Sequence, residues 1–264
     1  MGKSIGILSL KGGVGKTSSV IALGDAISDF GKKVLLVDAN FSSPNLGLFL
    51  NVIDPEITLH HALNRTGDIR NAVHELPNFD ILPSDIFHKN KISPMNLKNR
   101  LSPLKKNYDY ILIDSSPSLN EETLGAMIAS DELIVITTPD IPSLVMTIKA
   151  VNLAKKRGTP IAGVVLNKVY NRRFELPLKD IEETLEVPIM AVIPHDINVL
   201  EAHSNNSPLT SYRPKSEASK EYKKLAASLI GERYNSGRIR DIFRNVIPNK
   251  QTINRELYYN SLFG

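Results

Sequence analysis

Residues 4–17 read SIGILSLKGGVGKT, an apolar run that leads into a glycine-rich loop. The apolar run, Ser4–Leu10, is typical of a buried strand, and a helical pattern follows over Lys16–Phe30. Glycines let successive backbone N–H groups turn toward one anion, and the helix N-terminus adds partial positive charge. Lys16 would neutralise phosphate charge, and Thr17 would offer its hydroxyl to Mg2+. The order of strand, loop and helix predicts a nucleotide-phosphate site, with an ordinary glycine-rich turn as the alternative.

Strand and helix patterns alternate along the chain after this loop. The predicted strands are Ser4–Leu10, Lys33–Asp38, Phe79–Leu82, Tyr110–Asp114, Leu133–Thr138, Ile161–Asn167 and Ile189–Ile193. The predicted helices include Lys16–Phe30, Glu121–Ser130, Pro142–Arg157, Pro177–Leu185 and Glu217–Glu232. This alternation predicts an α/β fold with a doubly wound, mostly parallel sheet. We expect one domain over 1–234 and a separate C-terminal tail over 235–264.

Composition excludes several classes of protein. The chain has 264 residues, of which 42% are hydrophobic and 23% charged, as in a globular domain. It has no cysteine, which excludes disulfides, iron–sulfur ligation and cysteine nucleophiles. No apolar run approaches the ~18 residues of a membrane span, and no signal peptide is expected, so the cytoplasm is the expected compartment. The histidines lack metal-binding spacing and are expected on the surface or in turns.

The loop departs from the standard phosphate-binding pattern at two positions. That pattern has glycine five residues before Gly15, where this chain has Leu10, and a second lysine, Lys11, stands at the head of the loop. This arrangement resembles the deviant Walker A loop of the ParA/MinD family of ATPases. The resemblance implies a three-layer P-loop fold, ATP and Mg2+ as cofactors, and a homodimer in the ATP state. In that dimer Lys11 would reach the partner's phosphates. The residues expected to contact the nucleotide phosphates are Gly12, Gly13, Val14, Gly15, Lys16, Thr17 and Ser18.

Two strands end in an aspartate at the predicted site. Asp38 ends one strand in Asp38-Ala39-Asn40, which resembles the family's first switch, and Asp114 ends another, before a Ser-Ser-Pro that resembles its second switch. With Thr17, these acids are the expected Mg2+ ligands, Asp114 through water. The family's second acid in the first switch is Asn40 here; an amide cannot accept a proton at neutral pH, although it can orient a water. We therefore expect slow basal hydrolysis. The alternative is that both aspartates only cap turns.

Two later strand ends resemble the family's base-binding elements. One ends in Asn167-Lys168, and the other continues into Pro194-His195-Asp196. The resemblance implies that Asn167 bonds the adenine edge and that the loop of Pro194 and Asp196 covers the ring. An amide can pair bidentately with adenine. Asparagine and proline are also common turn residues, so a purely structural role remains the alternative.

The C-terminal tail carries most of the net positive charge. The whole chain has a formal charge of +4, and residues 237–264 hold five basic and two acidic side chains, a net +3. Apolar residues in 237–247 recur with helical spacing, at Ile239, Ile242, Phe243, Val246 and Ile247. Arginines border this stripe, as in a helix that lies in a membrane interface. The MinD branch carries such a C-terminal helix. Packing on its own domain and docking on a protein partner are the alternatives.

These features favour a MinD-like ATPase switch that cycles on and off the inner face of the cell membrane and positions cell-division or other polar machinery. Its turnover would depend on an activating protein partner that the sequence does not identify. One alternative is a ParA-like segregation ATPase that binds DNA non-specifically, which the nearly neutral body makes less favoured. Another is a nucleotide-dependent regulator with low turnover, which Asn40 keeps open.

Overall fold

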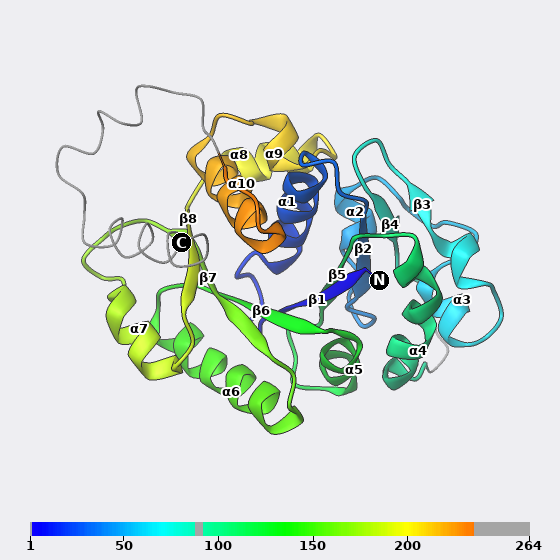
Figure 1. The fold of residues 1–264 in the computed structure, drawn as a ribbon, viewed down its shortest axis with the longest axis horizontal. Coiled ribbons are helices and arrows are strands. Elements are labelled where there is room, and N and C mark those ends of the chain that lie inside the picture. The colour runs from blue at the N-terminus through cyan, green and yellow to red at the C-terminus, as the bar shows by residue number, and fades with distance from the viewer. Residues whose placement is uncertain (1, 88–91, 235–264) are drawn as a thin grey trace.

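The glycine-rich loop leaves the carboxyl end of β1 (Lys3–Leu8), a strand in the interior of the sheet (Figure 1). The computed structural model describes residues 2–87 and 92–234. The other strands there are β2 (Val34–Ala39), β3 (His74–Glu75), β4 (Asp80–Leu82), β5 (Tyr110–Ser115), β6 (Glu132–Thr137), β7 (Ile161–Val169) and β8 (Ile189–Pro194). They form one sheet in the order β3-β4-β2-β5-β1-β6-β7-β8, in which only the pairing of β3 with β4 is antiparallel.

Helices cover both faces of this sheet (Figure 1). One face carries α1 (Lys16–Ser28), α2 (Leu46–Phe49), α8 (Asn198–Ser204), α9 (Leu209–Tyr212) and α10 (Glu217–Ile230). The other carries α3 (Leu59–Leu63), α4 (Leu97–Leu101), α5 (Glu121–Ala129), α6 (Ile141–Arg157) and α7 (Leu178–Leu185). Short 3-10 helices are η1 (Ile69–Ala72), η2 (Pro94–Asn96) and η3 (Ser102–Lys106). The prediction of a three-layer, doubly wound, mostly parallel α/β fold is confirmed.

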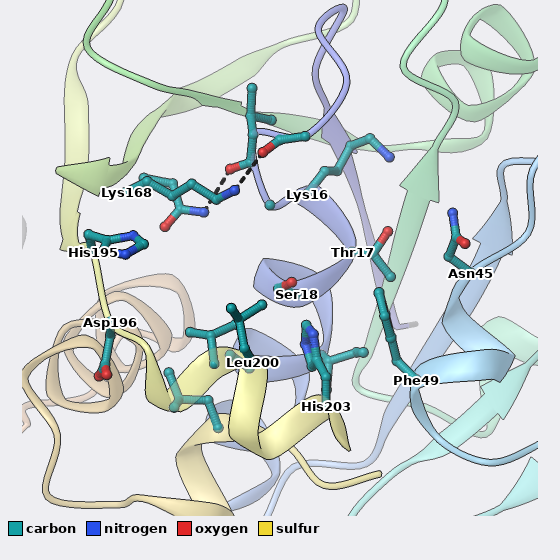
Figure 2. Close-up of a pocket in the computed structure, with 18 of the residues that line it drawn as sticks. Lys16, Thr17, Ser18, Asn45, Phe49, Lys168, His195, Asp196, Leu200 and His203 are labelled. Carbon is teal, nitrogen blue, oxygen red and sulfur yellow. Dashed lines mark hydrogen bonds between the residues drawn. The ribbon is translucent and has the colours of Figure 1, made fainter. Parts of the chain in front are cut away.

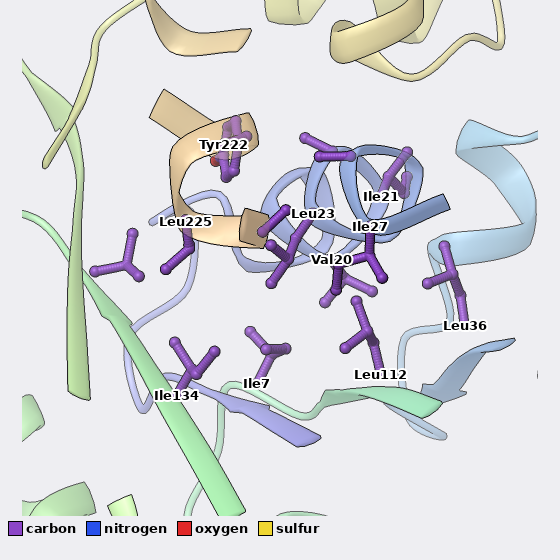
Figure 3. Close-up of a cluster of buried hydrophobic side chains, with 14 of the residues drawn as sticks. Ile7, Val20, Ile21, Leu23, Ile27, Leu36, Leu112, Ile134, Tyr222 and Leu225 are labelled. Carbon is purple, nitrogen blue, oxygen red and sulfur yellow. The ribbon is translucent and has the colours of Figure 1, made fainter. Parts of the chain in front are cut away.

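Helix α1 is the central helix of its layer; it packs on the sheet and against α10, which lies beside it (Figure 3). Its apolar side chains meet Ile7 of β1 and Leu112 of β5 on one side and Leu225 of α10 on the other. Gly24 permits the close approach of α1 to the sheet, because a Cβ atom at this position would lie 2.5 Å from Leu36 Cδ2. The glycine-rich loop, predicted to bind phosphate and here called the phosphate loop, leads into α1 and is therefore anchored by a helix that is buried on two sides.

The strand order places the loop where the chain connections diverge. From β1 the chain crosses through α1 to β2 on one face, and from β5 it crosses through α5 to β6 on the other. Ligands of open α/β sheets bind in the crevice at this point, outside the carboxyl ends of the strands. Strands β2 and β5 are neighbours, and their register pairs Asp38 with Asp114. The fold therefore brings both predicted metal ligands beside the loop.

Element boundaries differ from the predictions in a few places. Strand β1 ends at Leu8 rather than Leu10, because the Ser9 hydroxyl bonds both the N–H and the carbonyl of Lys11 and turns the chain out of the sheet. The short elements α2, α3, α4, α8, α9 and β3 were not predicted, since spans this short give little periodicity. The predicted tail, 235–264, and its amphipathic segment, 237–247, lie outside the described residues. Within the described ranges, no helix combines the length and apolar character needed to cross a bilayer.

A buried carboxylate joins α1 to α9 on the α10 side of the molecule. Asp25 is fully buried and accepts hydrogen bonds from Asn78 Nδ2 at 2.6 Å, Thr210 Oγ1 at 2.5 Å and Ser211 Oγ at 2.8 Å. A buried donor that loses its acceptor costs about 1–3 kcal/mol. This cluster therefore fixes α9 against the helix that follows the phosphate loop.

We predict that Asp25→Ala lowers the free energy of unfolding by about 3 kcal/mol, because its donors lose their acceptor. The matched control is Asp29→Ala at the C-terminal end of the same helix, where the carboxylate is 42% exposed and pairs with Lys223. That exposed pair should contribute about 1 kcal/mol or less. Chemical denaturation of both variants tests this, and equal losses would contradict the role given to Asp25.

Candidate functional site

A cavity of about 380 Å³ opens at the carboxyl ends of the central strands (Figure 2). It is lined by the glycine-rich loop, the first turns of α1, the ends of β7 and β8, and residues of α2 and α8. The loop residues Lys11 to Ser18 all line it, as do Asn40, Asn167, Lys168, Pro194 and Asp196. The structure thus brings nearly all the predicted site residues to one cavity. Asp38 and Asp114 lie beneath it, fully buried at the strand ends.

The loop backbone has the conformation that a phosphate cradle needs. Gly13 and Gly15 have φ of +76° and +89°, values that side chains other than glycine rarely adopt. Gly15 also caps α1, and no side chain caps the N–H groups at this end of the helix. A Cβ atom on Gly15 would lie 2.4 Å from Asn167 Nδ2, so the loop packs tightly against β7. Uncapped N–H groups at a helix N-terminus fit the phosphates of a nucleotide.

Lys16 is held by the strand end beside it. Its Nζ lies 2.8 Å from Asp114 Oδ1 and also donates to the Ser115 carbonyl. Thr17 Oγ1 donates to the other oxygen of Asp114 at 2.6 Å. Lys16 and Asp114 are both buried. The lysine and the hydroxyl that would meet phosphate and metal therefore converge on one carboxylate.

Asp38 lies next to that carboxylate on the neighbouring strand. Its oxygens accept hydrogen bonds from the N–H groups of Asn40 at 3.1 Å, Asn45 at 3.1 Å and Leu46 at 3.0 Å. Burial, and then the negative charge of Asp114, raise the pKa of Asp38 to about 7. A divalent cation would stabilise the charged forms of both acids. The oxygens of Thr17, Asp38 and Asp114 therefore fit Mg2+, either directly or through water.

Asn40 presents a free acceptor beside the cavity. Its Nδ2 donates to the Ser43 carbonyl at 2.5 Å, whereas its Oδ1 is buried and has no hydrogen-bond partner. A buried acceptor without a partner is costly unless a water or ligand meets it. This geometry fits the prediction that Asn40 orients a water without accepting its proton.

Lys11 is held by its own chain in this structure. Its Nζ lies 3.0 Å from Asp140 Oδ1 and 2.7 Å from Ser143 Oγ. Asp140 also caps α6, accepting from the Ser143 N–H. Partial burial opposes ionisation of Asp140, but hydrogen bonds from Thr138, Ser143 and Lys11 lower its pKa to about 2. Asp140 was not among the predicted site residues, although an aspartate before Ile-Pro at a strand end is a recognisable helix cap.

Two of the four predicted base-binding residues support the loop. Asn167 Nδ2 donates to the Val14 carbonyl at 2.8 Å, and Lys168 Nζ donates to the Gly13 carbonyl at 2.7 Å. Asp196 Oδ1 accepts from the N–H of Asn198 at the start of α8. These bonds give the residues a structural role at the cavity wall. Contact of Asn167, Lys168, Pro194 and Asp196 with a base stays a prediction.

Sequence reasoning missed two aromatic rings in the cavity wall. Phe49 of α2 and His203 of α8 line the cavity together (Figure 2). His203 was expected on the surface or in a turn, but it lies half-buried against Phe49. No local pattern could reveal this pair, because the two residues are far apart in the sequence and meet only in the folded chain.

Two family models match the chain. A family model described as an AAA domain matches residues 2–157, and one described as 4Fe-4S iron sulfur cluster binding proteins of the NifH/frxC family matches 90–242. The chain has no cysteine to ligate such a cluster. An uncharacterized ATP-binding protein of Methanocaldococcus jannaschii is 34% identical over 89% of this chain and 90% of its own length.

Two further matches have named roles. The chromosome partitioning protein ParA of Caulobacter vibrioides is 32% identical over 86% of this chain and 93% of its own length. The septum site-determining protein MinD of Pyrococcus horikoshii, solved with Mg-ADP, has 34% identity and a TM-score of 0.82. That match covers 87% of this chain and 96% of the solved one.

We predict that Lys16→Ala weakens binding of Mg-ADP about 100-fold, because a charge-assisted bond to phosphate, worth up to about 3 kcal/mol, is lost. The variant should also melt at a lower temperature without nucleotide, since Asp114 loses its cation. Titration calorimetry measures the affinity, and Lys179→Ala, which removes a lysine from an exposed pair with Glu183, is the control. Unchanged affinity in Lys16→Ala would rule out this phosphate site.

Proposed function

Because the chain belongs to the ParA/MinD family of P-loop ATPases, we propose that it is a MinD-like switch, an ATP-dependent dimer that cycles on and off a membrane. As a member of this family the chain is an ATPase, with ATP and Mg2+ as cofactors. The proposed cycle would position cell-division or other polar machinery at the inner face of the cell membrane. An activating protein partner would stimulate hydrolysis.

The position of Lys11 carries this proposal. Its side chain is 37% exposed at the mouth of the phosphate cavity, and Asp140, which holds it, is 42% exposed. An ion pair this exposed is worth about 1 kcal/mol or less, so the triphosphate of a second subunit could displace it. Lys16 stays with its own chain's site, because it is buried against Asp114. The two lysines can therefore serve opposite subunits.

The loop after Asp38 is suited to act as the switch. Asp38 holds the N–H groups of Asn45 and Leu46 at the start of α2, so a change at the metal site moves this segment. In other nucleotide switches the γ-phosphate and its Mg2+ order such loops, and hydrolysis releases them. Here Asn40 would orient the attacking water, and ordering of the loops would close the dimer.

The sequence of the tail supports membrane attachment. Residues 237–247 carry the apolar stripe bordered by arginines. One such helix binds an anionic surface reversibly, and two copies tethered in a dimer bind much more tightly. ATP would thus attach the protein by dimerisation, and hydrolysis would release it. The division of the chain into a domain over 1–234 and a tail over 235–264 is part of this proposal.

A ParA-like role in DNA segregation is the second candidate, and one surface feature favours it. A groove on the α3 and α4 side of the molecule is lined by Arg65, Arg70 and Arg100, with Asp68 as its one acidic residue among those described. Arginines in a groove can contact the phosphate backbone of DNA without reading its sequence. A regulator with low turnover is also consistent with Asn40.

We predict that Lys11→Ala abolishes dimers formed with Mg2+ and a non-hydrolysable ATP analogue, while analogue binding by the monomer remains. Light scattering measures the mass, and calorimetry measures the binding. Lys3→Ala is the control, because Lys3 is a half-exposed lysine at the opposite end of β1. Dimers that persist in Lys11→Ala would refute the role across the interface.

The amide at position 40 should limit turnover. We predict that Asn40→Asp raises the ATP hydrolysis rate about 100-fold, the lower end of what a general base contributes. Asn45→Asp is a matched control, because Asn45 Nδ2 also donates to the Ser43 carbonyl, at 2.9 Å. An unchanged rate in Asn40→Asp, or equal increases in both variants, would show that the missing carboxylate is not limiting.

The membrane and DNA roles are separated by sedimentation. With ATP and Mg2+, we predict that the full chain pellets with anionic liposomes and that truncation after Tyr234 removes this binding. Parallel samples contain duplex DNA with either the wild-type chain or a variant in which Arg65, Arg70 and Arg100 are replaced by alanine. Lipid binding that survives truncation, or pelleting with DNA alone, would overturn the membrane proposal. Loss of DNA binding in the triple variant would support the second candidate.

A further inference from the structure

Two aromatic side chains, Phe49 and His203, line the cavity below Thr17 and Ser18 in the view of Figure 2. The rings of Phe49 and His203 stack with their centroids 4.2 Å apart and their planes 16° apart. Phe49 ends α2, and His203 lies in the last turn of α8. The stack therefore joins α2 to α8 at the cavity wall.

On one side, the stack belongs to α2, whose start is hydrogen-bonded to Asp38, one of the predicted Mg2+ ligands. Helix α2 is one turn long and starts at Leu46, whose N–H donates to Asp38 Oδ2 at 3.0 Å. Asn45, which precedes it, donates to the same oxygen. Phe49 therefore lies three and four positions along the chain from Leu46 and Asn45, whose N–H groups help to orient Asp38. A displacement of Phe49 would therefore shift α2 and the hydrogen bonds that hold Asp38.

On the other side, the stack borders the space left for a nucleoside. The loop and Lys16 hold the phosphates, so the rest of the nucleotide must occupy the cavity beyond the first turn of α1. The lining there is mainly apolar, with Ile21 and Ala22 of α1 and Val199 and Leu200 of α8. Aromatic and aliphatic walls of this kind suit the flat face or edge of a base.

We propose that Phe49 and His203 contact the nucleoside part of the bound nucleotide and transmit its presence to the segment that holds Asp38. In other proteins, replacing an aromatic side chain that stacks on a base with alanine costs about 1–3 kcal/mol of binding free energy per base. Burial lowers the pKa of His203, which favours the neutral ring. The pair is thus a positioning device that lets the site distinguish a nucleotide from inorganic phosphates.

This inference rests on the nucleotide site and not on the membrane cycle. Its test therefore uses ADP, which requires neither a dimer nor a membrane. The comparison ligand is inorganic pyrophosphate, which offers the same number of phosphates to the loop and no nucleoside. If the membrane proposal fails, this inference can still hold, and the reverse is also true.

The experiment is calorimetric titration of the full chain with Mg-ADP and with Mg-pyrophosphate. The variants are Phe49→Ala, His203→Ala, the double variant and His203→Phe, with Phe174→Ala, an exposed aromatic outside the cavity, as control. We expect either single alanine variant to bind ADP about tenfold more weakly than the wild type, and pyrophosphate less than twofold more weakly. The double variant should lose little more than either single one, because the two rings act as a unit. His203→Phe should restore most of the ADP affinity.

A second readout tests the transmission to Asp38. In the wild type, half-maximal binding of ADP should need less Mg2+ than that of pyrophosphate, and Phe49→Ala should remove this difference. The inference is overturned if ADP affinity is unchanged in both alanine variants. It is also overturned if the variants lose as much affinity for pyrophosphate as for ADP, since the rings would then only support α2. A third contradicting result is a wild type that needs the same Mg2+ concentration for half-maximal binding of both ligands.

Discussion

The ion pair between Lys16 and Asp114 is the interaction on which the site depends. It joins the phosphate loop after β1 to the end of β5, with Nζ and Oδ1 2.8 Å apart and both side chains buried. Removing one partner of such a pair leaves an uncompensated charge, at a cost of about 3–5 kcal/mol. A bound phosphate offers Lys16 another anion, and Mg2+ offers Asp114 another cation. Nucleotide and metal bound together would therefore leave neither side chain without a counter-charge.

The same constraint connects the other parts of the site. Asp38 is paired in register with Asp114, and its raised pKa reflects burial and the neighbouring charge. Mg2+ would relieve that repulsion, and its effect would reach α2 through the N–H groups of Asn45 and Leu46. Lys11 stands apart, held by the exposed Asp140. One lysine thus belongs to the interior of its own chain, and the other is available at its surface.

The sequence was informative where local chemistry decides the structure. The loop, the strands that end in Asp38 and Asp114, and the helix after Gly15 could be located, because glycine conformations, apolar runs and strand-end acids are local signals. The resemblance to the ParA/MinD family rested on Lys11 and is confirmed. Contacts between distant segments could not be located. Asp140 beside Lys11 and the stack of Phe49 on His203 arise only when α6 and α8 fold against the loop and α2.

The most direct test of this account is ADP binding to Asp114→Asn, measured by calorimetry in EDTA and in Mg2+. Without metal, the variant should bind ADP more tightly than the wild type, because Lys16 is released and a negative charge is removed. With Mg2+ the wild type should gain affinity and the variant should gain little. Weaker binding of the variant in EDTA, or an equal gain from Mg2+ in both proteins, would contradict the exchange of Lys16 between Asp114 and phosphate.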